Sequence, residues 1–377
     1  MSISDHLTVE TNSISALEKE KRSHQQIVRP RVYEKIQAHN SDTLNGTISP
    51  ILRLKINRSA CNMQCQHCCE EPYMTRDLVK RTGKKDPRIQ MELPDYKKLS
   101  EEADEYGIFR FVITGGEALL DRKLGDLIDT LDPYKHLIIL DSNGWFFDDE
   151  KAKWFADKGG YKVQISLDSM NPADHDAFRR TPGAHAKALR AFKAAKKAGL
   201  QMLLSSCLIK DRVFTDEFEE MMAFCAEEEI PLYLTLAKPV GSGKGHDEWV
   251  CTKRDVDQLK FLEDKHQIFT HMTPSYGHPG KCITVKGINT VNHDGEIMPC
   301  PFMDMSLGNV TKDPLSLILE RGMKNKWLGP YRDECIIGEN WEFIKFHNDK
   351  VNEWSEETPY LPVPYEKGFA LTDKVPE

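Results

Sequence analysis

The sequence predicts an α/β protein built on a partial barrel of six βα units. Apolar strand patterns alternate with amphipathic helical patterns over residues 94–236, and a further strand pattern stands at residues 51–57. Repeated β–α–β order is typical of a parallel sheet with right-handed crossovers. Six units are fewer than the eight that close a barrel, so one side is expected to stay open. The 377 residues, 40 % of them hydrophobic, suffice for this domain and a smaller second one.

Each element of the barrel has its own local signal. Pro94 opens the first helix, and Gly107 is placed to end it. Cys225 lies on the apolar face of a late helix and Cys207 in mid-strand, so both are interpreted as core residues. Alternating or continuous apolar runs predict the strands, and apolar residues at helical spacing predict the helices. The strands are expected at residues 51–57, 109–114, 136–141, 161–167, 200–209 and 231–236, and the other helices near residues 124–131, 148–158, 185–198 and 214–225.

Changes of pattern divide the chain into four parts. Residues 1–50 form a polar N-terminal extension without a strand pattern, in which residues 27–37 could form a short helix that packs on the domain. The barrel is expected at residues 51–245, a second domain at 246–345 and a C-terminal tail at 346–377.

Composition and charge indicate a protein of the reducing cytoplasm. Ten unevenly clustered cysteines in a long chain are untypical of a secreted disulfide framework. The N-terminus lacks the basic-then-apolar order of a signal peptide, and no apolar run approaches the roughly 18 residues of a membrane span. A net charge of −8, with both signs interspersed, argues against nucleic acid as the main partner. We therefore expect a cytoplasmic localisation and no membrane partner.

Three cysteines, Cys61, Cys65 and Cys68, fall within eight residues directly after the first strand. Thiolates suit iron–sulfur clusters and zinc. A zinc knuckle is the alternative, but it would need a fourth ligand at a paired spacing, and the adjacent Cys69 is poorly placed to share one small ion. Three ligands on one tight loop favour a cubane cluster with three irons held and one open. A loop that follows a strand is also where an α/β barrel places its chemistry.

This cysteine spacing resembles that of the radical S-adenosylmethionine (SAM) enzymes, whose fold is also a partial (β/α)6 barrel. The resemblance implies a 4Fe–4S cluster on Cys61, Cys65 and Cys68, with SAM chelating the open iron. It further implies that one electron splits the sulfonium of SAM and yields a 5′-deoxyadenosyl radical. His67 lies between two of the ligands and is expected to shape the cofactor loop.

The second strand ends in Gly115-Gly116-Glu117, which matches a further motif of this family. Paired glycines let a ligand approach the backbone closely, and a carboxylate accepts hydrogen bonds from an ammonium group. Taken alone, the same three residues would fit any strand-to-helix turn. The resemblance implies that they receive the amino group of SAM.

Small polar residues end the third and fourth strands, at the mouth of the expected barrel. The alternative is turn and capping chemistry, because Asn-Gly is a favoured turn pair and an aspartate can cap a helix. In the family, corresponding positions touch the methionine carboxylate or the ribose of SAM, and an arginine often lies near that carboxylate. These comparisons imply cofactor contacts for Ser142, Asn143, Ser166, Asp168 and, from the Arg179–Arg180 pair, Arg179.

The C-terminal third contains a predicted hairpin with Cys282 before it and Cys300 at its end, and Cys335 follows a helical segment. The pattern resembles SPASM and Twitch auxiliary-cluster domains, although the dense cysteine run of a full SPASM domain is missing. It implies one auxiliary 4Fe–4S cluster on Cys282, Cys300 and Cys335. The fourth iron is either open or held by another residue such as Cys251. A zinc ribbon or free core thiols are the alternatives.

Residues 70–91 form a long basic insertion after the cysteine loop. We interpret it as a solvated loop, and the alternative is a lid or a docking site for an electron donor.

These features together predict a cytoplasmic radical SAM oxidoreductase that abstracts hydrogen from a small-molecule substrate, with flavodoxin or ferredoxin as electron donor. Peptide-modifying relatives often carry an N-terminal domain that grips a leader peptide, and the first fifty residues look too few for one. A maturase of a ribosomally made peptide is the first alternative, and a non-catalytic iron–sulfur or zinc protein is the second. The sequence does not name the substrate, the reaction outcome or the oligomeric state.

Overall fold

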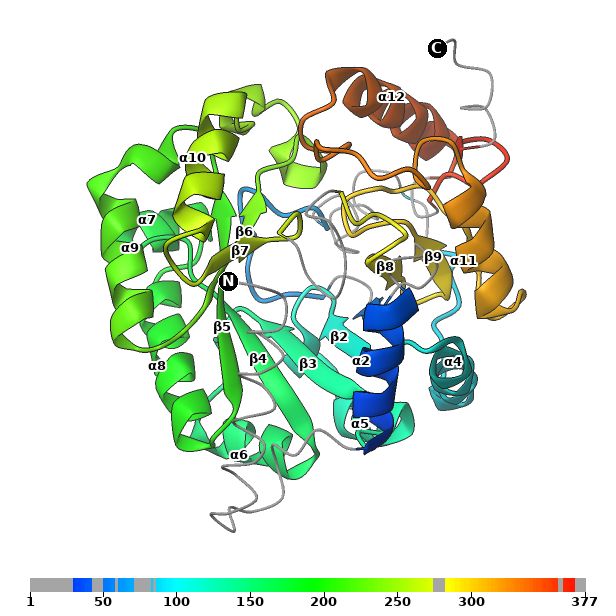
Figure 1. The fold of residues 1–377 in the computed structure, drawn as a ribbon, viewed down its shortest axis with the longest axis horizontal. Coiled ribbons are helices and arrows are strands. Elements are labelled where there is room, and N and C mark those ends of the chain that lie inside the picture. Colours follow the sequence, from blue (N-terminus) through cyan, green and yellow to red (C-terminus); the bar gives the residue numbers. More distant parts are fainter. Residues whose placement is uncertain are drawn as a thin grey trace.

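A single mixed sheet organises the part of the chain that the computed structural model describes, namely residues 30–42, 50–57, 60–70, 83, 86–273, 282–358 and 362–369. Within these residues the sheet has ten strands, in the order β10-β9-β8-β1-β2-β3-β4-β5-β6-β7. Figure 1 shows that the sheet is curved and that helices lie on its outer side. The predicted α/β fold with a partial barrel and a C-terminal hairpin is therefore confirmed.

The barrel part of the sheet contains, within the described residues, the six predicted strands and one more. Each strand from β1 to β6 pairs in parallel with its successor. The seventh strand lies beyond residue 245, where the sequence placed the end of the barrel. The strands are β1 (Ile51–Lys55), β2 (Arg110–Thr114), β3 (Leu137–Ser142), β4 (Gly160–Ser166), β5 (Gln201–Leu208), β6 (Leu232–Leu236) and β7 (Ile268–Thr270).

The barrel helices begin and end where local chemistry favours it. Gly107 ends the first of them with a φ of 93°, a left-handed conformation that glycine adopts without strain. Asp148 caps another by accepting a hydrogen bond from the backbone N–H of Lys151. Cys225 is buried in the main hydrophobic core, as predicted. The helices are α4 (Leu93–Tyr106), α5 (Leu124–Leu131), α6 (Asp149–Asp157), α7 (Pro172–Phe178), α8 (Ala184–Lys197), α9 (Asp216–Glu227) and α10 (Lys253–Glu263).

The C-terminal hairpin joins the barrel sheet at its first strand. β8 (Ile288–Val291) pairs in parallel with β1, and antiparallel with β9 (Glu296–Met298). β10 (Gly308–Asn309) extends the hairpin. The helices α11 (Leu315–Lys324) and α12 (Trp341–Glu357) complete this part of the chain. The auxiliary-cluster segment thus shares one continuous sheet with the barrel.

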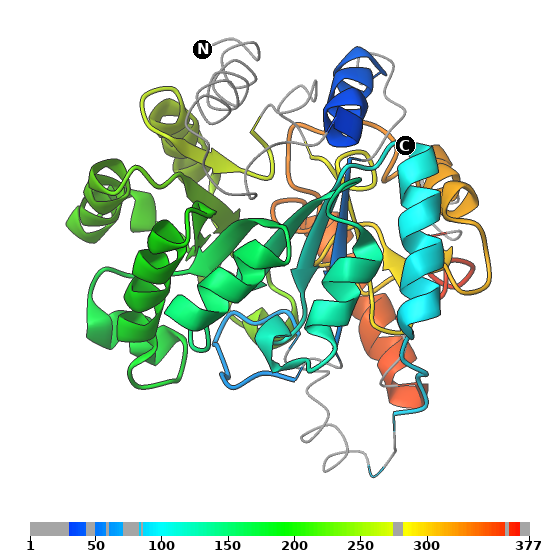
Figure 2. The ribbon, with the colours of Figure 1, turned by 90° about the horizontal axis from the view of Figure 1, so that it is seen from below.

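The helix α2 (Pro30–Asp42) packs on the barrel, as expected for residues 27–37. Its buried Val32 and Ile36 pack with Phe109 and Leu137. Figure 2 shows α2 and the cysteine loop, coloured light blue, at opposite ends of the sheet.

Most of the N-terminal extension and of the insertion at residues 70–91 lies outside the described residues, so the interpretations of both segments stay predictions. None of the described helices is both long enough and apolar enough to cross a bilayer.

Candidate active site

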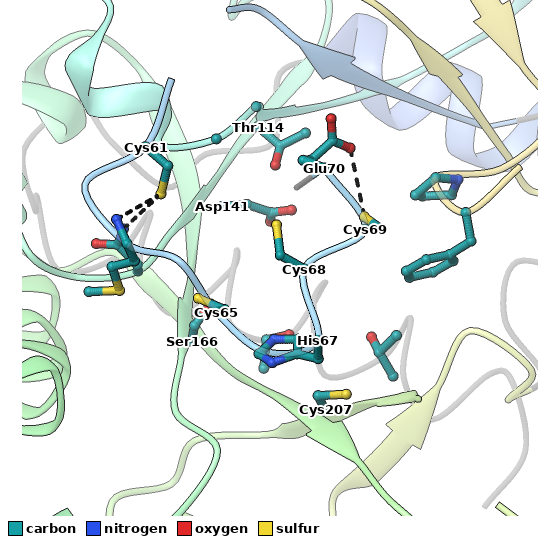
Figure 3. A pocket seen from close by; sticks show the side chains of 18 of the residues that line it. Cys61, Cys65, His67, Cys68, Cys69, Glu70, Thr114, Asp141, Ser166 and Cys207 are labelled. Atoms are coloured by element: carbon teal, nitrogen blue, oxygen red, sulfur yellow. Dashed lines mark hydrogen bonds between the residues drawn. The ribbon is translucent and has the colours of Figure 1, made fainter. Parts of the chain in front are cut away.

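The cysteine loop and the C-terminal ends of the barrel strands line one pocket. Cys61, Cys65 and Cys68 lie along the loop, and Thr114, Asp141 and Ser166 lie opposite on the strands (Figure 3). Of the sequence-predicted cofactor residues, the pocket is lined by His67, Gly115, Gly116, Ser142, Asn143, Ser166 and Arg179. Glu117 and Asp168 are absent from its lining, and both carboxylates lie buried behind it.

Two neighbouring segments fix the cysteine loop. The backbone N–H of Gln66 donates to the carbonyl of Phe178 at 2.9 Å, and the His67 ring stacks on the Phe178 ring with centroids 4.5 Å apart. On the other side, the N–H of Ser242 donates to the carbonyl of Cys68 at 2.9 Å. A Cβ on Gly241 would lie 2.4 Å from that carbonyl oxygen, so only glycine fits there. The loop is therefore held by contacts with Phe178 on one side and with Gly241 and Ser242 on the other.

The thiols of this loop suit a cluster better than a single ion. Burial raises the pKa of Cys61 to about 11 and raises the pKa values of Cys65 and Cys68 too, so all three thiols are neutral unless a cation binds them. No group of three His, Cys, Asp or Glu side chains in the described residues could hold one metal ion. In a cubane each thiolate binds a different iron, so the sulfurs stand apart. The three cysteines are compatible with such a cluster, and their assignment as its ligands stays a prediction.

The glycine pair after β2 is fixed by the end of β1. The side-chain oxygen of Asn57 accepts a hydrogen bond from the N–H of Gly116 at 3.1 Å. The same oxygen would lie 2.7 Å from a Cβ on Gly115, whose φ is +151°. The backbone of Gly115 and Gly116 therefore lines the pocket without side chains, so a ligand can approach it closely.

Glu117 holds the neighbouring strand end rather than facing the pocket. Its carboxylate accepts hydrogen bonds from the Ser142 hydroxyl at 3.1 Å, the Asn143 N–H at 2.9 Å and the Leu119 N–H at 3.2 Å. Burial, opposed by these hydrogen bonds, raises its pKa to about 7. Ser142 and Asn143 themselves line the pocket. The contact predicted between Glu117 and the SAM ammonium stays a prediction.

Replacing Glu117 by alanine is expected to weaken SAM binding roughly ten- to a hundredfold, which corresponds to about 1.4–2.8 kcal/mol. The substitution leaves the buried Asn143 N–H without its acceptor and frees Ser142, so two pocket residues lose their support. The measurement is SAM affinity by calorimetry on anaerobically reconstituted protein of equal iron content. Glu117→Gln keeps one acceptor oxygen and should lose less. Unchanged affinity in the alanine variant would count against any role for this carboxylate.

Asp168 and Arg179 form a buried ion pair at the pocket wall. The Nε of Arg179 lies 2.6 Å from Asp168 Oδ2, and Asp168 Oδ1 accepts a hydrogen bond from the Cys207 N–H at 2.8 Å. Burial acts to raise the pKa of Asp168, but the guanidinium outweighs it and holds that pKa well below its usual range. Arg179 Nη1 reaches to 3.8 Å from Cys65 Sγ, whereas Arg180 is exposed. Of the pair, Arg179 is the one that lines the pocket, and Asp168 supports it; its contact with SAM stays a prediction.

A polar layer inside the barrel was missed by the sequence analysis. Arg53 and Lys55 alternate on β1 with core leucines and point into the pocket. Arg53 Nη2 lies 2.8 Å from Asp141 Oδ2, and Lys55 pairs with Glu70. An alternating strand pattern does not say which face is inside, and here the polar face lines the interior. Cys207, which was predicted to be a core residue, is buried but also lines the pocket, together with Thr114, Gln164, Ser205, Ser206, Thr235 and Lys238.

The three C-terminal cysteines are buried side chains that border the same region. The N–H of Cys282 donates to the carbonyl of Arg332 at 2.8 Å, and the N–H of Cys335 donates to the Glu339 carboxylate at 2.6 Å. Cys300 is followed directly by Pro301 and Phe302, which line the active-site pocket. The auxiliary segment therefore forms part of the pocket wall.

Cys251, the candidate fourth ligand, is buried in the main core. Its thiol donates a weak hydrogen bond to the carbonyl of Leu208 at 3.4 Å. The choice between this ligand and an open iron stays a prediction.

Comparison with known proteins agrees with this architecture. The radical SAM superfamily profile matches residues 59–225, and the SPASM iron–sulfur cluster-binding domain profile matches residues 282–336. Among curated proteins, an AdoMet-dependent heme synthase of Nitratidesulfovibrio vulgaris is 22 % identical over 74 % of this chain and 81 % of its own length. The mycofactocin maturase MftC of Mycolicibacterium smegmatis is 26 % identical over 71 % of this chain and 67 % of its own length.

Solved structures show the same fold. SuiB of Streptococcus suis bound to precursor peptide SuiA aligns with a TM-score of 0.56 and 14 % identity, covering 84 % of this chain and 77 % of that one. A radical SAM domain carries a 4Fe–4S cluster and SAM, and a SPASM domain carries auxiliary iron–sulfur clusters. The two matched segments together span more than half of the sequence. The chain therefore belongs to the radical SAM superfamily and carries a SPASM iron–sulfur domain.

Proposed function

We propose that this protein cleaves SAM reductively and uses the resulting radical to abstract hydrogen from a polar small molecule bound inside the barrel. The observation that carries the proposal is the composition of one pocket. Three loop cysteines, a bare glycine backbone and a charged interior layer all line it. A passive cluster carrier needs neither the glycine site nor the charged interior, which is why we favour an enzyme.

In this proposal Cys61, Cys65 and Cys68 hold the SAM-binding cluster, and Cys282, Cys300 and Cys335 hold an auxiliary one. When bound, the SAM-binding cluster would supply the electron that splits the sulfonium and so generates the 5′-deoxyadenosyl radical. We assign the barrel to residues 51–245 and the auxiliary domain to 246–345, with α10 and β7 as the part of the latter that continues the barrel sheet.

SAM would lie along the strand ends. The backbone carbonyls of Gly115 and Gly116 would accept hydrogen bonds from the amino group of SAM. Ser142, Asn143 and Ser166 would bind its carboxylate or ribose. Arg179 would supply the positive charge for the carboxylate, and its support from Asp168 keeps the guanidinium oriented. His67 stacks on Phe178, so its role would be to keep the loop in shape rather than to bind SAM.

The substrate would bind against the polar residues that line the barrel interior. Arg53, Lys55 and Asp141 present both signs of charge to the interior, which suits a small molecule that carries polar or charged groups near the C–H bond to be broken. Enclosure by the auxiliary segment at Pro301 and Phe302 would help to exclude water from a radical. An auxiliary cluster there could take one electron from the product radical, and a flavodoxin or ferredoxin would restore the catalytic electron.

A peptide substrate is the second candidate. Two relatives are named as maturases, MftC and the sporulation killing factor maturation protein SkfB of Bacillus subtilis, and the SuiB structure contains a precursor peptide. The heme synthase relative supports the small-molecule choice in the same way. A peptide would have to insert one side chain into the charged layer.

Anaerobic reconstitution with iron and sulfide, followed by SAM and dithionite, tests the proposal. We expect release of 5′-deoxyadenosine, measured by chromatography, and we expect it to rise when a true substrate is added. In deuterated substrate pools, deuterium in 5′-deoxyadenosine identifies the molecule from which hydrogen is taken. No 5′-deoxyadenosine from a protein with a full iron complement would favour the non-catalytic alternative. Deuterium transfer from peptides alone would favour the maturase.

A further inference from the structure

Two buried lysines flank the C-terminal cysteines. The side chain of Lys238 follows β6, and that of Lys286 lies in the turn between Cys282 and β8; the residues are 7 % and 2 % exposed. Within the described part of the chain, neither ammonium lies within 4.0 Å of a carboxylate. Both lysines instead donate to backbone carbonyls.

Lys238 lies between the active-site pocket and Cys335. It lines the pocket, and its Nζ donates to the carbonyl of Leu236 at 2.8 Å and lies 5.2 Å from the centroid of the Phe302 ring. A Cβ built on Gly338 would lie 3.0 Å from Lys238 Nζ and 3.1 Å from Cys335 Sγ. The Lys238 ammonium and the Cys335 thiol therefore both lie close to Gly338, where a larger residue would contact both.

Lys286 lies near Cys282. Its Nζ donates to the carbonyl of Leu328 and, at 3.1 Å, to that of Pro330, and it lies 5.1 Å from the centroid of the Tyr331 ring. Burial lowers its pKa to about 8, while the nearby Cys282 acts in the opposite direction. A negative charge at Cys282 would stabilise the charged form of Lys286.

Burial of two ammonium groups without an anion is costly, so buried charges are normally paired or bound to a charged cofactor. Glu339 is the acidic neighbour of Cys335, but its carboxylate accepts the Cys335 N–H at 2.6 Å and is not within ion-pair distance of either lysine. As thiolates, the three cysteines could supply the missing negative charge, because Cys282 acts on Lys286 and Lys238 acts on Cys335. A cubane core of two positive charges with three thiolates is a monoanion, and it becomes a dianion when it gains one electron.

We propose that Lys238 and Lys286 are the counter-charges of the auxiliary cluster and raise its reduction potential. The inference rests on the proposed ligands Cys282, Cys300 and Cys335. Cations beside a cluster stabilise its reduced form more than its oxidised form, because reduction adds a negative charge in a low-dielectric site. Lys238 also lines the active-site pocket, so it lies near both that pocket and the proposed ligand Cys335.

The test uses the full-length chain with Cys61, Cys65 and Cys68 replaced by alanine, so that only the auxiliary cluster remains. Its midpoint potential is measured by a redox titration followed by electron paramagnetic resonance, with iron content determined on the same samples. Lys238→Met should shift the potential downward, and Lys238→Arg should keep it near the background value. Lys286→Met should shift it downward as well, and the two methionine substitutions together should shift it further. Lys193→Met, a loss of one exposed charge on α8, is the control and should change nothing.

Each contrary result has a distinct meaning. If the triple-alanine variant contained no iron, both the assignment of the auxiliary ligands and the counter-charge role would be wrong. A full cluster with an unshifted or raised potential in both lysine-to-methionine variants would overturn the counter-charge role alone. Loss of iron in Lys238→Met and Lys238→Arg alike would show that the side chain is needed for packing or ligation and would also overturn it.

Discussion

Simultaneous replacement of Cys61, Cys65 and Cys68 by alanine is expected to abolish 5′-deoxyadenosine formation and to leave the sheet folded. The loop lies outside the main core, and only Met63, Cys65 and Ala184 form a small buried cluster there. Its anchors to Phe178 and Ser242 are backbone hydrogen bonds that do not involve the thiols. Activity is measured by chromatography after anaerobic reconstitution, and folding by circular dichroism and thermal unfolding.

The adjacent cysteine is the matched control for this variant. Cys69 also lines the pocket, and its thiol lies 3.7 Å from Glu70 Oε1. Cys69→Ala should therefore retain most of the 5′-deoxyadenosine formation. Persistent SAM cleavage in the triple variant, or its complete loss in Cys69→Ala, would mean that the cluster is held by a different set of thiols.

Replacing Asp168 by alanine is expected to lower the free energy of unfolding by about 3–5 kcal/mol, because it leaves Arg179 as an unpaired buried charge. The Cys207 N–H also loses its acceptor. Unfolding by urea, followed by fluorescence under anaerobic conditions, measures the loss. Asp149→Ala removes an exposed ion pair with Lys197 and should cost about 0–1 kcal/mol.

A double variant separates the charge from the carboxylate's other contacts. Asp168→Ala combined with Arg179→Met removes both members of the pair, so it should be more stable than Asp168→Ala alone. It should still bind SAM poorly if Arg179 supplies the positive charge in the site. If Asp168→Ala is as stable as Asp149→Ala, the prediction is wrong. Water would then reach Arg179, and the ion pair would not be buried in solution.

Much of the barrel could be predicted because its signals are local. The strands β1 to β6 are apolar runs of ordinary length, and helix ends such as Gly107 carry recognisable caps. The helix α7 has only seven residues, few of them apolar, and β7 has three, so neither gives a periodic pattern. The pairing of β8 with β1 joins segments far apart in the chain, and no local pattern reports such a partner.

The site divides in the same way. Loop cysteines and the glycine pair stand in short motifs, so their positions could be assigned from spacing. Glu117 stands in the glycine motif and Asp168 at the end of the fourth strand, but in the structure they support Asn143 and Arg179 and do not line the pocket. Arg53 and Lys238 belong to no motif; Arg53 lines the pocket because of the face of β1 that turns inward, and Lys238 lines it from the segment that follows β6. The direction of a side chain depends on the tertiary fold, so the spacing of residues in the sequence could not predict that these two line the pocket.

The pairing of β8 with β1 also bears on how the chain reaches its native state. Among the described strands β1 comes first in the chain, and one of its two neighbours, β8, is made only after the whole barrel has been synthesised. Until then β1 has an open hydrogen-bonding edge, which is a template for pairing with another chain. Contacts between such distant segments also slow folding. We therefore expect nascent or truncated forms that lack β8 to depend on chaperones and to aggregate through β1, whatever the stability of the finished protein.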